Sequence, residues 1–182
     1  MRRLTSPLVI LTVGLLAGYA AGSRSLRAQT APPLAGTFTH VGMIVPNVEK
    51  ASHDFAELFG LEYKAPSEFT AMVYPADFKG DPKAHPKTVT YKVGDNVSVE
   101  LLEPIGGKSP WRDFLDSTGG VGGLHHMAFA AKGIDAHMAA LKTRGGVIEF
   151  GGSAGATPVQ YAYVNMRPKL GLTIELNGPP KP

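Results

Sequence analysis

The stretch HVGMIV at residues 40–45 returns 86 positions later as HMAFAA at residues 126–131. Each copy begins with a histidine and leads into a segment with helical spacing, and the two copies align without a gap over about 22 positions. Each copy also leads to a strand-like segment with one glutamate, Glu100 in VEL and Glu175 in IEL. The sequence therefore predicts a duplicated unit that carries one histidine and one glutamate per copy.

Hydrophobic spacing predicts the same order of elements in both copies, β-α-β-β-β. Apolar residues at helical spacing indicate helices at residues 48–59 and 134–143. A polar loop at residues 77–87 lengthens the first copy, and Ser109 followed by Pro110 marks the start of a further short helix. The expected strands are residues 38–45, 61–64, 69–74, 88–93 and 97–103 in the first copy, and 126–131, 147–150, 159–165 and 172–177 in the second.

Alternation along each strand places the histidines and glutamates on faces with mostly small or polar neighbours. His40 shares its face with Gly42, and His126 shares its face with Ala128, whereas bulky apolar residues occupy the opposite faces. The bulky faces should pack under the helices, and the other faces should line a cavity. We expect four side chains to meet in that cavity: His40, Glu100, His126 and Glu175.

Two imidazoles and two carboxylates suit one divalent ion, such as Fe, Mn, Co, Ni or Zn. A single histidine at a strand start is more often structural, and a single glutamate in a strand more often faces solvent. Four such residues at symmetry-related positions are much less expected by chance. The sequence therefore predicts a metal site, without choosing among these metals.

Several other residues have side chains that could take part in a reaction, but the sequence favours a structural role for them. His125 lies on the strand face opposite to His126, which predicts a structural role or one behind a ligand. Glu103, at a strand end, should face solvent. We expect His53 and His137 to lie on helix surfaces and His85 to lie in the polar loop. Trp111 and Phe114 should lie in the core or over the cavity.

The first 30 residues differ from the rest of the chain. Arg2 and Arg3 precede an apolar run of about 14 residues, and small residues follow, as in a secretory signal. The run is short for a spanning helix, which needs roughly 20 apolar residues. We expect residues 1–30 to be a signal peptide or an N-terminal anchor and residues 31–37 to be a linker. The domain would then be exported, periplasmic or extracellular, or else membrane-anchored by this segment.

Charge excludes one class of partner. The formal net charge is +3, but four of the 18 basic residues and none of the 15 acidic residues lie in the first 30 positions. The remaining chain is close to neutral, so no basic patch indicates nucleic acid binding. The chain has no cysteine, so its core must stabilise it without disulfides.

Five segments carry a likeness to a known family. They resemble the vicinal oxygen chelate superfamily, which includes glyoxalase I, methylmalonyl-CoA epimerase, extradiol dioxygenases and bleomycin-resistance proteins. The likeness is greatest to the methylmalonyl-CoA epimerase branch and covers about residues 38–178. The segments are residues 40–45, 99–104, 109–115, 123–129 and 173–176.

The resemblance implies an α+β fold in which two βαβββ modules, residues 38–106 and 123–178, form a half-open, mostly antiparallel eight-stranded barrel around one divalent metal. In epimerase and glyoxalase relatives, the metal holds an enolate while a carboxylate moves a proton next to a carbonyl. The epimerases have an additional catalytic glutamate, for which Glu68 is the candidate. Relatives commonly dimerise, so the resemblance allows a homodimer, although the sequence does not fix the oligomeric state. The implied metal ligands are His40, Glu100, His126 and Glu175, and the implied catalytic residues are Glu175 and Glu100.

These arguments predict an exported, divalent-metal-dependent isomerase, epimerase or lyase that acts on a small carbonyl or carboxylate compound. Two alternatives belong to other classes. One is a non-catalytic small-molecule-binding module of the resistance type, and the other is an Fe(II)-dependent ring-cleaving dioxygenase. Glu100 favours the isomerase or lyase. The ligand set of the dioxygenases resembles the four residues named above, but it has two histidines and only one carboxylate, and Glu100 fills the position that they lack. Export argues against substrates attached to coenzyme A, which is a cytoplasmic carrier.

Overall fold

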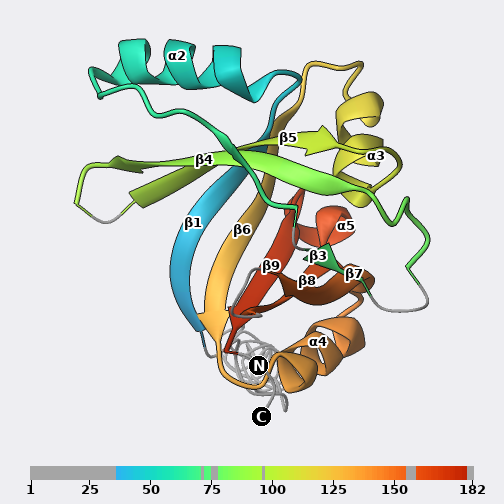
Figure 1. The fold of residues 1–182 in the computed structure, drawn as a ribbon. Coiled ribbons are helices and arrows are strands. Elements are labelled where there is room, and N and C mark those ends of the chain that lie inside the picture. Colours follow the sequence, from blue (N-terminus) through green and yellow to red (C-terminus); the bar gives the residue numbers. More distant parts are fainter. Residues whose placement is uncertain (1–35, 71, 75–77, 96, 155–158, 180–182) are drawn as a thin grey trace, which may run out of the picture. The chain divides into compact units, whose positions relative to one another are not determined.

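The two copies of the repeat meet along β1 (Gly36–Ile44) and β6 (Gly123–Ala131), which pair antiparallel in the middle of one sheet. Figure 1 shows these two long strands side by side, with the remaining strands continuing the sheet on either side. The structure is a computed structural model that describes residues 36–70, 72–74, 78–95, 97–154 and 159–179. The pairing of β1 with β6 joins the two modules directly.

The strand order across the sheet is β2-β4-β5-β1-β6-β9-β8-β7-β3. The first module contributes β4 (His85–Val93) and β5 (Val97–Ile105), and the second contributes β7 (Val147–Ala154), β8 (Val159–Asn165) and β9 (Thr173–Gly178). β1 pairs with β5 in parallel and β6 pairs with β9 in parallel, whereas the other described pairs are antiparallel. This arrangement confirms the predicted α+β half-open barrel, with nine strands in place of eight.

Two short edge strands account for most of the difference from the expected pattern. β2 (Ser67–Glu68) pairs with β4, and β3 (Met72–Val73) crosses to pair with β7 of the second module. The expected strand at residues 61–64 is wrong. Leu61 packs under the first helix, and the backbone N–H of Lys64 donates to the hydroxyl of Tyr91 at 3.0 Å instead of to a neighbouring strand.

The helices begin and end where local residues satisfy their ends. α2 (Val48–Phe59) has the predicted bounds, and its N-cap Asn47 accepts a hydrogen bond from the N–H of Lys50 at 2.8 Å. The helix ends at Gly60, which has a φ of 63°, a left-handed conformation that favours glycine. α3 (Pro110–Ser117) has Ser109 as its N-cap, as predicted.

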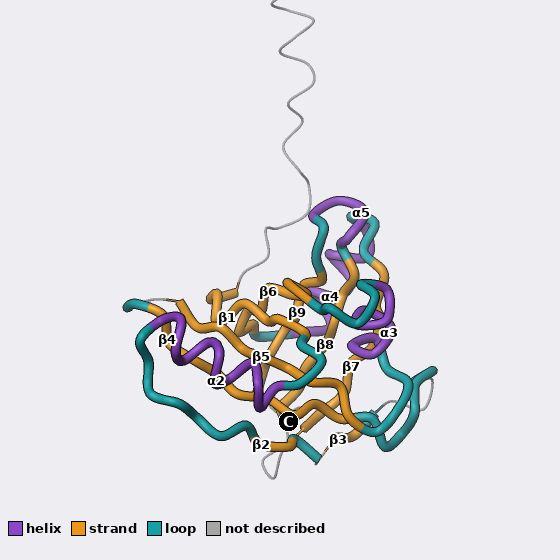
Figure 2. The backbone as a smooth tube through the Cα atoms, turned by 90° about the horizontal axis from the view of Figure 1, so that it is seen from above, coloured by secondary structure: helices purple, strands orange, loops and turns teal. Residues whose placement is uncertain are grey.

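The second module carries two helices. α4 (Ile134–Thr143) has the predicted bounds and packs on β7, β8 and β9. α5 (Arg167–Leu170) is a single turn that connects β8 to β9 and was not expected, because so short a helix leaves no hydrophobic period in the sequence. Figure 2 shows the helices and strands from a second direction, with α2 lying along β4 and β5.

Apolar side chains form three clusters, and each buried large side chain contributes about 1.5–3 kcal/mol to folding. One cluster lies under α2 and includes Val48, Ala56, Tyr91 and Leu101. A second lies under α4 and includes Ile134, Leu141, Val164 and Leu176. The third joins α3 to the sheet and includes Ile44, Leu102, Trp111, Leu115, Phe150, Tyr161 and Tyr163.

The predicted leader, residues 1–30, and residues 31–35 of the predicted linker lie outside the described residues. The last two linker residues, Gly36 and Thr37, belong to β1. In the described part of the chain, no helix has both the length and the apolar character needed to cross a bilayer.

Candidate metal centre

Strand register brings one histidine and one glutamate together in each module by the same offset. In the first module, Glu100 on β5 pairs with Gly42, two residues after His40 on β1. In the second module, Glu175 on β9 pairs with Ala128, two residues after His126 on β6. The repeat in the sequence is thus a repeat in the geometry of the sheet.

The antiparallel pairing of β1 with β6 then brings the two histidines together. His40 lies opposite Ala128, and His126 lies opposite Gly42. A Cβ at Gly42 would lie 1.9 Å from Cε1 of His126, so only glycine leaves room for that imidazole ring. Gly42, which shares a strand face with His40 in the sequence, is therefore needed to fit the ring of His126.

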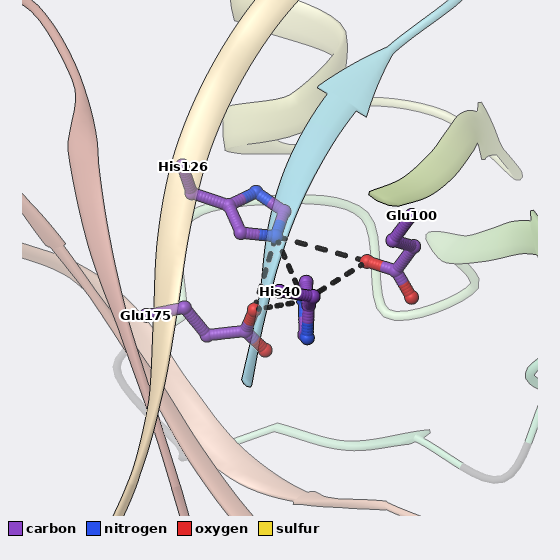
Figure 3. Close-up of side chains that lie close together, drawn as sticks. All are labelled: His40, Glu100, His126 and Glu175. Atoms are coloured by element: carbon purple, nitrogen blue, oxygen red, sulfur yellow. Dashed lines mark hydrogen bonds and ion pairs between the residues drawn. The ribbon is translucent and has the colours of Figure 1, made fainter. Parts of the chain in front are cut away.

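The four predicted side chains converge on one point, as Figure 3 shows. Nε2 of His126 lies 3.0 Å from Oε2 of Glu175 and 3.7 Å from Oε2 of Glu100. Nε2 of His40 lies 3.2 Å from Oε2 of Glu175 and 3.6 Å from Oε2 of Glu100. The two Nε2 atoms are 3.4 Å apart. We call His40, Glu100, His126 and Glu175 the four-residue cluster.

These separations fit ligands around a single ion. With metal–ligand bonds of about 2.1 Å, neighbouring ligand atoms lie about 3.0 Å apart in octahedral geometry and about 3.4 Å apart in tetrahedral geometry. All four ligand atoms lie within 4.8 Å of one another. Two imidazole nitrogens and two carboxylate oxygens are also donors that bind divalent first-row metals.

One carboxylate oxygen in the four-residue cluster lacks a hydrogen bond. Oε2 of Glu175 is buried and accepts no hydrogen bond, although two ring nitrogens lie within 3.2 Å of it. Buried carboxylates are costly without hydrogen-bond partners or a metal. A cation among the four ligand atoms would satisfy this oxygen.

Burial and charge act in opposite directions at the four-residue cluster. Burial disfavours the charged form of His126, but Glu175 and Glu100 outweigh it and raise the pKa of His126 to about 9. Burial likewise disfavours the carboxylate of Glu175, but His126 and then His40 outweigh it and hold its pKa well below the usual range. Without a metal, the pair is therefore an imidazolium and a carboxylate at neutral pH.

Comparison with known proteins assigns this geometry to a family. A profile described as the Glyoxalase/Bleomycin resistance protein/Dioxygenase superfamily matches residues 39–163. The chain belongs to this superfamily. The match spans the first module and most of the second, which agrees with the predicted resemblance.

Individual relatives in this superfamily are epimerases. The chain is 30% identical over 112 residues to the ethylmalonyl-CoA/methylmalonyl-CoA epimerase of Cereibacter sphaeroides, which covers 62% of this chain and 73% of the relative. It is 27% identical over 154 residues to the mitochondrial methylmalonyl-CoA epimerase of Homo sapiens, which covers 79% of this chain and 80% of the relative. The methylmalonyl-CoA epimerase of Mycobacterium tuberculosis has a similar fold, with a TM-score of 0.52 at 20% identity, over 87% of this chain and 96% of that structure.

The four-residue cluster of this superfamily member lies in the wall of a cavity of about 290 Å³. His40, Glu100 and Glu175 reach the cavity surface, whereas the side chain of His126 is completely buried behind them. The other lining residues are mainly apolar or aromatic: Phe69, Met72, Pro86, Thr88, Leu102, Trp111, Tyr161, Tyr163 and Asn177. An ion held by the cluster would therefore face a mostly apolar chamber.

Two tyrosines of the cavity were not predicted from the sequence. Tyr161 and Tyr163 alternate on one face of β8, and Tyr163 pairs in register with Glu175. Burial and then Glu175 raise the pKa of Tyr163 well above its usual value, so its hydroxyl stays protonated. The alternation is visible in the sequence, but the register of β8 against β9 is not.

His85 and Glu68, two other residues considered in the sequence, contact each other. Nε2 of His85 lies 3.3 Å from Oε2 of Glu68, and Nδ1 of His85 lies 2.8 Å from the carbonyl oxygen of Lys83. Glu68 is half-exposed and is not among the described residues that line the cavity. It is therefore not positioned like a base for a substrate in this cavity.

The residues for which the sequence predicted no catalytic role lie in different parts of the structure. His53 is exposed on α2 and its ring stacks on Tyr63, with 4.0 Å between the ring centres. Trp111 is buried in the core and also lines the cavity, as expected. The expectation for Glu103 is wrong, because its Oε2 accepts a hydrogen bond at 2.9 Å from the backbone N–H of Val48 at the start of α2.

Proposed function

We propose that this chain is a divalent-metal-dependent enzyme of the epimerase type that moves a proton at the carbon next to a carbonyl group. The observation that carries this proposal is the convergence of four ligand atoms of the kind that bind metals. One of them, Oε2 of Glu175, is buried and has no hydrogen bond. A cluster with a purely structural role would be expected to satisfy that oxygen. Membership of a superfamily with epimerase relatives supports the same reaction type.

The ligand atoms of the four-residue cluster would hold the ion with the two Nε2 atoms and the two Oε2 atoms. A bound divalent ion would polarise a substrate carbonyl and stabilise the negative charge that develops on its oxygen when a neighbouring carbon loses a proton. His126 is completely buried, so its place is fixed by packing. His40 and Glu100 are partly exposed and face the cavity, where a substrate would arrive.

Glu175 and Glu100 are the candidates for moving the proton. Both carboxylates approach the imidazoles through Oε2, which leaves Oε1 of each outside these contacts. Figure 3 shows the second oxygen of Glu100 directed away from the histidines and that of Glu175 directed away from His126. We propose that an Oε1 atom takes the proton from the substrate carbon and returns it, since a general base must lie within hydrogen-bond distance of that proton.

The apolar walls would assist this step. Leu102, Trp111 and Tyr163 are buried or nearly so, and they border the cavity beside the four-residue cluster. A chamber of this kind excludes water and strengthens the electrostatic interactions inside it. The cavity is only partly enclosed, so these walls reduce the contact of the proposed reaction with bulk solvent without abolishing it.

We also propose that the domain works outside the cytoplasm, on the basis of the signal-like segment at residues 1–30. The names of the relatives specify coenzyme A thioesters for those proteins. An exported domain would meet smaller carbonyl compounds instead. The proposed reaction type is therefore that of the relatives, while the proposed substrate is not.

Metal content tests the proposal directly. The full chain and three variants, His126→Ala, Glu100→Gln and Glu103→Gln, would be analysed by elemental mass spectrometry after metal reconstitution. Glu100 and Glu103 lie on the same strand and receive the same substitution, so they form a matched pair. We expect about one transition metal per chain in the unmodified protein and in Glu103→Gln, and clearly less in the other two.

Proton transfer is then tested by NMR in deuterated water with a metal-loaded chain and carbonyl compounds that carry an exchangeable α-hydrogen. We expect deuterium to enter that position, and Glu175→Gln to abolish the exchange. Failure to bind any metal after reconstitution would show that the proposal is wrong. Metal binding without exchange would favour a binding module, and oxygen uptake with iron would favour the dioxygenase.

A further inference from the structure

The cavity beside the four-residue cluster has no cationic side chain in its described walls. Its uncharged polar side chains are Thr88, Asn177, Tyr161 and Tyr163, and the remaining walls are apolar apart from the cluster. Lys87 is adjacent to Thr88 on β4 but lies on the alternate face of the strand, where its Nζ is 3.8 Å from Oε2 of Glu49. Among the described residues, no lysine or arginine is therefore available in this wall to pair with a negatively charged substrate.

The charges of the four-residue cluster add to this effect. Glu100 and Glu175 supply two negative charges, which balance a divalent ion held with two neutral imidazoles. A carboxylate substrate would therefore meet a centre with no net positive charge. It would also leave water for a mostly apolar chamber, and burial of an unpaired charge is costly. An uncharged carbonyl oxygen would avoid that cost.

We propose that this cavity selects an uncharged carbonyl compound with a small apolar body and discriminates against carboxylate anions of the same shape. The inference rests on the proposed function for the position of the substrate beside the four-residue cluster. It names a substrate class that differs from the acidic malonyl groups in the names of the relatives. A volume of about 290 Å³ accommodates a compound of one aromatic ring with a short oxygen-bearing arm.

The walls also match an apolar body of that size. Leu102 and Trp111 are nearly inaccessible to solvent, and Phe69 is about half-exposed (45%). Aromatic walls bind flat apolar groups through offset or edge-to-face contacts. The oxygen-bearing end would then lie toward the four-residue cluster, and the ring would lie between the aromatic side chains.

Methyl mandelate and mandelate form a matched pair of probes. Both have a phenyl ring, a hydroxyl group next to a carbonyl, and one α-hydrogen, and only mandelate carries a negative charge. Trp111 is the chain's single tryptophan and lines the cavity, so its fluorescence reports binding without turnover. The full chain would be titrated with each probe, with and without bound Mn²⁺.

We expect methyl mandelate to bind at least tenfold more tightly than mandelate in both states. Mandelate binding as tightly as the ester, or more tightly, would overturn the proposal. So would the absence of any fluorescence response to methyl mandelate up to its solubility limit.

Two variants at one wall position separate charge from shape. Thr88→Lys adds a cation to the wall, and Thr88→Met adds a side chain of similar length without charge. We expect Thr88→Lys to shift the ratio of the two dissociation constants toward mandelate by at least threefold, and Thr88→Met to leave the ratio unchanged. Equal ratios in the two variants would contradict an electrostatic origin of the selectivity.

Failure of this inference is distinguishable from failure of the proposed function. The proposed function fails if the chain binds no metal, or if no carbonyl compound exchanges its α-hydrogen. The inference fails if the anion binds at least as well as the ester, whatever the exchange experiment shows. The binding titration does not depend on catalysis.

Discussion

The Nδ1 atoms of His125 and His126 lie 3.0 Å apart in the interior of the protein. Burial, with smaller effects from His126 and Arg167, lowers the pKa of His125 to about 2, so its ring is neutral. The raised pKa of His126 makes it the protonated partner in the metal-free protein. Nδ1 of His126 therefore donates to Nδ1 of His125, and Nε2 of His126 is the nitrogen that can release its proton to bind a metal.

This hydrogen bond predicts a role for His125 in metal affinity. His125→Leu removes the acceptor behind His126 and leaves its Nδ1–H unpaired. Loss of such a partner typically weakens metal binding by about 10–100-fold. We expect that loss in a competition titration against a chelator of known affinity.

His125→Asn is the matched control, because the amide oxygen can take the place of the ring Nδ1 as acceptor. We expect it to retain most of the metal affinity. Equal affinity in the leucine variant and the unmodified protein would contradict the orienting role. Urea denaturation of both variants separates this effect from a general loss of stability.

A second prediction concerns Gly42, which lies opposite His126 in the sheet. Gly42→Ala places a methyl group on the imidazole ring, since the added Cβ would lie 1.9 Å from Cε1 of His126. The ring cannot retreat, because His126 is buried on all sides. We expect more than tenfold weaker metal binding and a loss of about 1–3 kcal/mol of folding free energy, as in other overpacked cores.

A double-mutant cycle tests whether the ring is the cause. In a His126→Ala background, the alanine at position 42 no longer meets an imidazole. We expect Gly42→Ala to be nearly neutral for stability there, which gives a large interaction energy between the two positions. The same destabilisation in both backgrounds would show that backbone strain, and not the ring, is responsible.

The sequence predicted the four-residue cluster because both partners of each pair lie on strands with a clear alternating pattern. His40 and His126 also stand at equal places in a repeat, so each supports the interpretation of the other. Helices at residues 48–59 and 134–143 were predicted with their observed bounds, because apolar spacing and nearby glycines mark them. Local pattern and internal symmetry were sufficient for this part of the molecule.

The remaining features depend on which strands become neighbours. Tyr163 faces Glu175 only because β8 pairs with β9 in one register, and no local signal specifies that register. Glu103 lies three residues after Glu100 in the same strand, yet it meets the start of α2 because β5 runs beside that helix. The crossing of β3 to β7 is equally non-local, so only the structure revealed that the strand expected near residues 69–74 pairs with the second module.

The contact of Glu103 with α2 gives a third prediction. Its carboxylate accepts a hydrogen bond from the N–H of Val48 at the positive end of the helix dipole. Interactions of this kind contribute about 0.5–2 kcal/mol. We expect Glu103→Ala to lower the folding free energy by about that amount in urea denaturation while metal content stays unchanged. Loss of metal in this variant would assign Glu103 to the metal centre instead.

The last prediction concerns pH. In the metal-free protein, the pKa of His126 is raised to about 9 from an ordinary value of 6.5. A group whose pKa is raised on folding contributes its full stabilisation at a pH below its ordinary pKa. That contribution is lost as the pH rises through its pKa in the folded state. The metal-free protein should therefore lose stability between about pH 6.5 and pH 9. The lowered pKa of Glu175 contributes stability above its ordinary value of 4.5 and loses it as the pH falls.

A bound metal replaces the proton on His126, so the metal-loaded protein should not lose stability over the same rise in pH. Metal affinity should increase with pH, by at most about tenfold per pH unit for one released proton. Urea denaturation at pH 6, 7 and 8, with Mn²⁺ and with a chelator, measures the widening gap between the two forms. His126→Asn removes the titrating ring and should abolish the pH dependence of the metal-free form between these values. A gap that stays constant with pH in the unmodified protein would show that metal binding does not displace a proton from His126.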